Sequence, residues 1–239
     1  MLYLQDVWAH KLQMTDAHST DHLAPIRQKL LVSALENVPF DGWSEATLRR
    51  AAEDNDISEG MALLAFPTIR DLVVYFIESI DHEMLAALSA MDLDNMRIRD
   101  RITAAIRARI EALAPHRESE RRAVAFMALP QNAGTSMQSV LSTVDLMWRA
   151  IGDQSTDFSY YSKRATLAGV LSGTILYWLA DLSEGYEDTW AFLDRRIEDV
   201  MKIEKTKARM RKVSGNGEGP SILGMLSRLR YGTANRMKD

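Results

Sequence analysis

The sequence predicts an all-α protein. Apolar residues recur at helical spacing along nearly the whole chain, and signals for β-strands are almost absent. With 239 residues, of which 46% are hydrophobic, the chain can bury a substantial core as one domain with appendages. No cysteine occurs, which excludes disulfide, zinc-thiolate and thiol chemistry.

The first third of the chain predicts three helices. The first is expected at 25–37, with Pro25 at an early position that suits proline. The second begins with Ser44 as its N-cap and runs to about Asp54, and a short third helix lies near 58–65. The apolar stripe of the first helix comprises Leu30, Leu31, Ala34, Leu35 and Val38.

Seven further helices follow by the same criterion, for about ten in total. They are expected at 69–90, 95–113, 118–129, 133–151, 157–180 and 187–211, with the last one after Pro220. The restart at Thr156 or Asp157 is expected because the polar side chains there can accept hydrogen bonds from free backbone N–H groups. The glycine-rich run Gly215-x-Gly217-x-Gly219-Pro220 predicts a linker.

These signals predict four regions along the chain. They are a flexible N-terminal segment (1–23), a helical domain (24–212), a glycine-rich linker (213–220) and an amphipathic helix (221–239). The net charge of −4 is uneven, because residues 202–239 carry +7 and the first 201 residues carry −11. An acidic body with a basic tail predicts that the tail meets anionic surfaces.

The tail predicts membrane contact. Its apolar stripe is formed by Ile222, Leu223, Leu226 and Leu229, and Arg228 and Arg230 supply positive charge. This pattern is typical of a helix that lies in the headgroup layer, although so small a stripe could equally dock onto the protein's own core. No signal peptide and no apolar run long enough to span a bilayer is recognised, so a cytoplasmic protein is expected.

The helices at 44–54 and 58–65 resemble the helix-turn-helix of TetR-type repressors. In that motif the short helix enters the major groove and grips phosphates. The corresponding run at 61–65, Met-Ala-Leu-Leu-Ala, has no side chain that donates a hydrogen bond, and nearby acids would repel phosphate. The sequence therefore predicts a TetR-like fold with a degenerate helix-turn-helix and no nucleic-acid partner. A TetR-type ligand-responsive transcriptional regulator remains the alternative, which a gel shift would reveal.

Catalytic constellations are missing from the sequence. It has five histidines, but no second Glu-x-x-His pair, phosphate-binding loop, dinucleotide fingerprint or nucleophile elbow. We therefore expect no enzyme activity, no metal and no cofactor.

The late helices predict a packing surface. Ala165, Gly169 and Gly173 recur every four residues, a spacing that lets another helix approach closely. In TetR-type folds the last two long helices form a dimer interface, so a homodimer is expected. The sequence leaves open whether this stripe packs within the chain or across the dimer.

The run Gly152-Asp-Gln-Ser-Thr-Asp-Phe158, followed by an aromatic pair and a basic pair, closely resembles a known family. It is similar to the ubiquinone-biosynthesis accessory proteins, the ninth member of the COQ series. Further matches span about 26–201 and stand in the same order: Pro39-x-x-Gly42-Trp43, Leu129-Pro130-x-Asn132 and Glu187-Asp188-Thr189-Trp190-x-Phe192-Leu193.

The resemblance implies a function, a site and a cytoplasmic location peripheral to the inner membrane. These proteins bind lipid, so it implies a partner that is an isoprenoid quinone intermediate or a phospholipid, which is presented to the membrane-associated demethoxyubiquinone hydroxylase. Arg164 is implied to lie near a lipid headgroup, although a salt bridge to Asp157 is an equally good reading of this arginine. The implied docking patch for the hydroxylase comprises Met147, Trp148, Asp157, Tyr160, Tyr161 and Arg164.

Overall fold

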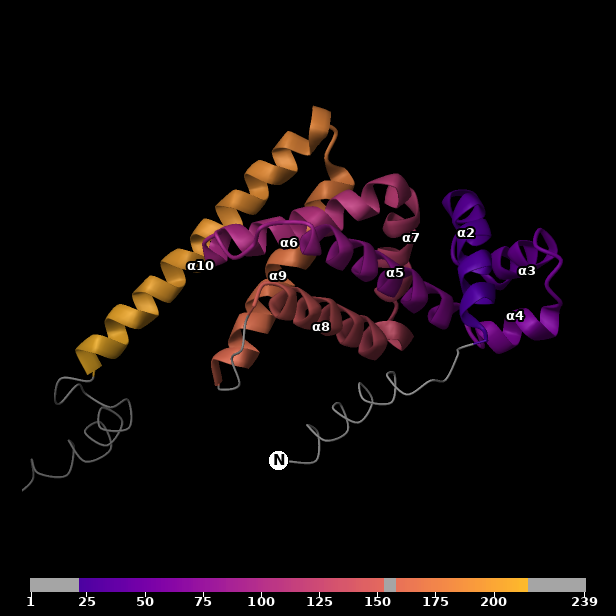
Figure 1. Ribbon diagram of the computed structural model, residues 1–239, viewed down its shortest axis with the longest axis horizontal. Coiled ribbons are helices and arrows are strands. Elements are labelled where there is room, and N and C mark those ends of the chain that lie inside the picture. Colours follow the sequence, from indigo (N-terminus) through magenta and orange to yellow (C-terminus); the bar gives the residue numbers. More distant parts are fainter. Residues whose placement is uncertain (1–21, 153–157, 215–239) are drawn as a thin grey trace, which may run out of the picture. The chain divides into compact units, whose positions relative to one another are not determined.

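The computed structural model describes residues 22–152 and 158–214, with side chains described in 22–152 and 162–202. All regular elements in these residues are α-helices or 3-10 turns, which confirms the predicted all-α class for the described part of the chain (Figure 1). The chain divides into two compact units, one ending at Ala180 and the other beginning at Asp181.

Three helices open the first unit: α2 (Ala24–Asp41), α3 (Glu45–Glu53) and α4 (Glu59–Ala65). Pro25 stands in the first turn of α2, as predicted, where its missing N–H costs no intrahelical hydrogen bond. The predicted end of this helix at residue 37 is too early. Pro39 falls in the last turn and is tolerated there, and Gly42, with φ of 72°, ends the helix.

Side-chain caps begin the two short helices. The hydroxyl of Ser44 accepts the N–H of Thr47 at 3.2 Å and starts α3. Ser58 does the same for Met61 at 3.3 Å and starts α4. Both caps satisfy N–H groups that have no partner within the helix, which is why elements this short are formed.

The helix α5 (Ile69–Ser89) carries the largest share of the core. A reciprocal capping box begins it, in which the Thr68 N–H donates to Asp71 at 2.9 Å and the Asp71 N–H donates to Thr68 at 3.3 Å. It packs against α6 and α8. Its buried apolar side chains, all at most 1% exposed, are Leu72, Val73, Phe76, Ile80, Met84 and Leu88.

The first unit continues with α6 (Ile98–Leu113), α7 (Arg117–Met127), α8 (Ala133–Ala150) and α9 (Phe158–Ala180), with 3-10 turns at Ala114–His116 and Pro130–Asn132. The helix α6 begins three residues later than predicted, because a turn at 92–97 precedes it and Asn95 donates to Asp92 at 2.7 Å. Two arginines of α7 fix the end of α9. Arg117 donates to the carbonyl of Trp178 at 2.7 Å, and Arg121 donates to that of Leu179.

The second unit contains the 3-10 turn Glu184–Tyr186 and α10 (Glu187–Ser214). Asp181 organises its start. The Asp181 carboxylate accepts the backbone N–H of Ser183 at 2.7 Å and that of Thr189 at 2.9 Å, together with both hydroxyls. Burial raises the pKa of Asp181, but these hydrogen bonds outweigh it and lower the pKa to about 2.

No single helix in the described ranges is long and apolar enough to cross a membrane. The pair α4 and α5 passes by length and composition only when joined across a 59° bend. The apolar face of α5 is buried inside the unit, as the side chains of Phe76 and Met84 show, both at 0% exposure.

Several predictions fall outside the described residues. These are most of the N-terminal segment (1–23), the helix restart at Thr156 or Asp157, much of the linker, and the C-terminal helix. The described residues therefore account for fewer helices than the ten expected. The predicted domain boundaries stay predictions.

Candidate functional site

The hairpin of α8 and α9 holds the residues implied by the sequence resemblance. The two helices pack against each other and are joined through residues 151–157. Asp145 of α8 is the centre of a charged cluster. Its Oδ1 accepts from Nε of Arg164 at 2.7 Å and from Nη2 at 2.6 Å, and its Oδ2 lies 2.7 Å from Nη2 of Arg149. One carboxylate therefore binds one arginine from each helix.

The two arginines differ in their exposure. The side chain of Arg164 is only 8% exposed, whereas that of Arg149 is 54% exposed. Sequence reasoning proposed Asp157 or a phosphate as the partner of Arg164 and missed Asp145. In an antiparallel hairpin, residues at similar distances from the connection lie opposite each other, and this register would have placed Asp145 beside Arg164.

Met147 and Trp148 lie beneath the surface of this hairpin. They are 0% and 6% exposed, and both belong to the core of the first unit. Lys163 covers the indole of Trp148, with its Nζ 5.5 Å from the ring centroid, in cation–π geometry. The indole N–H of Trp148 is buried and has no acceptor among the described residues.

The remaining predicted site residues have no described side chains. Asp157 lies outside the described residues, and so do Ile222, Leu223, Leu226, Arg228, Leu229 and Arg230. Tyr160 and Tyr161 are placed in the first turns of α9 by their backbone alone.

Arg101 of α6 holds the end of α8 in place and was missed in the sequence. It donates to three carbonyl groups, those of Met96, Asp94 and Ile151, each at 3.0 Å. The bond to Ile151 satisfies a carbonyl at the end of α8. Nothing in the local sequence distinguishes this arginine from its neighbours on α6.

A second charged cluster is buried between α5, α6, α7 and α8. Arg109 pairs with Asp81, and Thr143 donates to the other oxygen of Asp81 at 2.8 Å. Burial raises the pKa of Asp81, against the opposing effect of Arg109. Burial likewise raises the pKa of Glu120. The positive charge of Arg109 lowers this pKa, and the negative charge of Asp81 raises it further. The guanidinium of Arg109 thus acts on two buried carboxyl groups.

An open groove of about 330 Å³ lies between α2, α5 and the turn Ala114–His116. Its lining includes the buried apolar side chains of Leu31, Phe76 and Ile80, together with the exposed Glu36 and Glu83. This volume is at the lower end of the roughly 300–1,000 Å³ of ligand pockets. Neither Asp81 nor Glu120 lines it, and no group of three metal-ligating side chains occurs in the described part of the chain.

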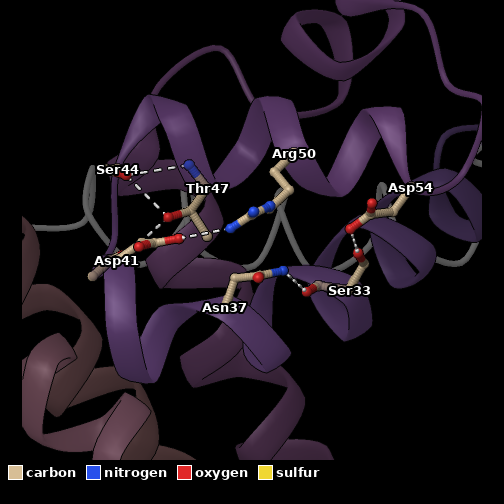
Figure 2. A network of polar contacts seen from close by, with 8 residues as sticks. Ser33, Asn37, Asp41, Ser44, Thr47, Arg50 and Asp54 are labelled. Atoms are coloured by element: carbon tan, nitrogen blue, oxygen red, sulfur yellow. Dashed lines mark hydrogen bonds and ion pairs between the residues drawn. The ribbon is translucent and has the colours of Figure 1, made fainter.

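Polar contacts join α2 to α3 and to Asp54, the residue that follows α3 (Figure 2). Ser33 of α2 donates to Asp54 at 3.3 Å, and Arg50 of α3 pairs with Asp41 at 3.2 Å. The guanidinium of Arg50 is thus directed to a carboxylate of its own chain (Figure 2).

Comparison with known proteins identifies relatives of this chain. Residues 133–204, which include α8, α9 and part of α10, match the COQ9 family model. The rat (Rattus norvegicus) ubiquinone biosynthesis protein COQ9, mitochondrial, is 32% identical over 206 residues. That match covers 83% of this chain and 66% of the rat protein, just under two thirds of its length. COQ9-B of Xenopus laevis is 31% identical over 204 residues, 81% of this chain and 67% of that protein.

A solved structure shows the fold. The TetR transcriptional regulator from Nitrosomonas europaea aligns with a TM-score of 0.62 at 21% identity, covering 73% of this chain and 97% of the regulator. This likeness confirms the predicted TetR-like architecture. The sequence matches identify the family: the chain belongs to the COQ9 family.

Proposed function

We propose that this protein acts in ubiquinone biosynthesis as a non-enzymatic accessory protein. It binds an isoprenoid quinone intermediate or a phospholipid, and presents substrate to the membrane-associated demethoxyubiquinone hydroxylase. The names of its relatives support the pathway. The lipid step follows from solvation, because a polyprenyl chain is insoluble in water and needs an apolar shield during transfer.

The observation that carries the docking part of the proposal is the charged α8/α9 hairpin. Asp145 fixes Arg164 and Arg149, and Lys163 lies over Trp148, so cations from both helices are held in defined positions. A preorganised surface loses less side-chain entropy on binding than a mobile one. Arg149 is exposed and Lys163 is partly exposed, so a partner can reach both, whereas Arg164 is buried and fixed by Asp145.

The hydroxylase-binding patch keeps the residues that the resemblance implies, with distinct roles. Met147 and Trp148 support the hairpin from below, since both are buried. Asp157, Tyr160 and Tyr161 would supply contact area on the surface, in keeping with the enrichment of tyrosine at protein interfaces.

The test is binding of the purified hydroxylase to the full chain. We expect Arg149→Ala and Tyr161→Ala each to weaken binding by about tenfold, the loss typical of an interface residue worth more than 1 kcal/mol. The matched control is Arg97→Ala, which removes another exposed arginine paired with an aspartate, Asp100 at 2.8 Å. Equal affinity of all three variants and the parent would contradict the patch.

The proposal includes a homodimer whose interface includes α9, the helix that carries the small-residue stripe. Large apolar side chains are exposed on this helix, including Leu176 at 57% and Tyr177 at 38%. Gly169 is exposed, and a methyl group added to it would meet nothing within 4 Å. The small-residue stripe is therefore open at Gly169, as a dimer interface requires.

Native mass spectrometry with lipid extraction tests the lipid part. Co-purified phospholipid or isoprenoid quinone on a dimer is the expected result. Lipid-free protein that also fails to take up a prenylated quinone from detergent would contradict lipid binding.

A further inference from the structure

The short helix α4 exposes three large apolar side chains. Met61, Leu63 and Leu64 are 37%, 52% and 59% exposed. Ala62 and Ala65 of the same helix are buried in the first unit. The space beside Gly60 is open as well, because a methyl group placed on this residue would meet nothing within 4 Å. Contiguous apolar groups on a surface commonly mark a binding site.

The chain around this helix is acidic. Between residues 41 and 59 there are six acidic residues and two arginines, which leaves a net charge of −4. One of those arginines, Arg50, is paired with Asp41 at 3.2 Å (Figure 2). At the far end of α4, Arg27 donates to the carbonyl of Ala65 at 3.1 Å, and Arg70 donates to Asn132 at 2.8 Å. Arg27, Arg50 and Arg70 are thus engaged within the chain, and the six acidic residues still outnumber the two arginines of this stretch.

This combination selects the chemistry of the partner. A DNA backbone and an anionic membrane would both be repelled by the acidic surroundings. An amphipathic helix with basic flanks complements both features, since its apolar face covers Met61, Leu63 and Leu64 and its cations meet the acidic residues. We propose that α4 is a protein-docking surface that receives a basic amphipathic helix of a partner protein.

This surface is independent of the hydroxylase patch. It is formed by α4 and the residues that flank it, whereas the patch lies on α8 and α9. Failure of the proposed function would leave the α4 proposal standing, and the reverse also holds.

The test uses the full chain and two labelled synthetic peptides. One is a helix of about 14 residues built from leucine and lysine at helical spacing, and the other has glutamate in place of every lysine. Fluorescence anisotropy measures binding, and hydrogen exchange locates the bound peptide. We expect the lysine peptide to bind, to protect α4, and to dissociate as salt is raised. The glutamate peptide should bind at least about tenfold more weakly.

The double variant Leu63→Ser/Leu64→Ser should bind the lysine peptide at least about tenfold more weakly than the parent chain. The matched control is Met137→Ser/Leu141→Ser, which removes two exposed apolar side chains from α8 and should leave this affinity unchanged. Circular dichroism checks that both variants fold. Equal losses in the two variants, protection outside α4, or tighter binding of anionic vesicles through Leu63 and Leu64 would each overturn the proposal.

Discussion

Arg109 is the residue on which the buried charge balance of the first unit depends. It faces two carboxyl groups, Asp81 and Glu120, and both are buried together with it. Removing one partner of a buried ion pair leaves an uncompensated charge, which costs more than the pair contributes. Loss of Arg109 should therefore destabilise the fold more than loss of one of the two carboxyl groups.

We predict that Arg109→Leu lowers the free energy of unfolding by about 3–5 kcal/mol, because it removes the buried guanidinium that acts on both acids. Urea unfolding followed by circular dichroism measures this change. The control is Arg99→Leu on the same helix, whose exposed partner Asp100 lies at 3.3 Å and whose loss should cost at most about 1 kcal/mol. Similar losses in the two variants would contradict a special role for Arg109.

Removing the charge of Glu120 is expected to raise the free energy of unfolding, in contrast to the loss of Arg109. Burial raises its pKa above the ordinary value of 4.5, so the folded state holds this proton to higher pH than the unfolded state does. The contribution of Glu120 to stability is therefore full below pH 4.5 and is lost as the pH rises through the raised pKa. We predict that Glu120→Gln is more stable than the parent at pH 7.5, and that this advantage shrinks toward pH 4.5. Urea unfolding across this range measures it, and a pH-independent difference would contradict the prediction.

Side-chain pairing was the least predictable part of the molecule. Thr143 and Asp81 are 62 residues apart in the sequence, and Arg101 and Ile151 are 50 apart. Helical periodicity shows which face of a helix is buried, but not which residue of another helix it meets. The partner of Arg164 was missed for this reason, although the position of the arginine near the start of α9 was predicted.

Elements, in contrast, could be predicted well. Ser44 and Ser58 act as caps in the structure, and the helices lie close to the predicted ranges. The errors are at the ends. The first helix was expected to end at residue 37, yet α2 continues through Pro39 to Asp41, because a proline in the last turn removes only one donor. Propensity fixes the existence of a helix more firmly than its end, where tertiary contacts decide.

The small-residue stripe of α9, which is open at Gly169, is expected to control assembly. Gly169→Leu should weaken the dimer by about tenfold to a hundredfold, because a larger side chain prevents close approach of a second helix. Analytical ultracentrifugation over a concentration series measures the dissociation constant. Gly134→Leu on α8 is the control, since Gly134 also has open space around it. Both variants should stabilise their own helix by about 0.5–1 kcal/mol, so monomer unfolding is no explanation for a lost dimer. A Gly169→Leu dimer as tight as the parent would place the interface elsewhere.

Over the whole molecule, charge is divided along the chain. The first 201 residues carry −11 and residues 202–239 carry +7, so the acidic helices and the basic tail favour different partners. The acidic surroundings of α4 disfavour anionic surfaces, and the tail supplies the positive charge that such surfaces attract. For the lipid-binding role proposed above, this separation would favour one orientation at a membrane, because a uniformly basic surface would bind membranes in many orientations.

The C-terminal tail is predicted to carry the membrane contact of the whole chain. Deleting residues 215–239 removes the predicted apolar stripe and four of the basic residues, each worth about 1 kcal/mol near an anionic bilayer. We expect the shortened chain to float poorly with vesicles that contain phosphatidylserine, while vesicles of phosphatidylcholine alone bind neither protein strongly. Two full-length variants separate the contributions. Arg228→Glu/Arg230→Glu should lose binding mainly at low salt, where charge attraction is strongest, whereas Leu226→Ser/Leu229→Ser should lose it at every salt concentration. Flotation of the shortened chain equal to that of the parent would show that the membrane contact lies outside the tail.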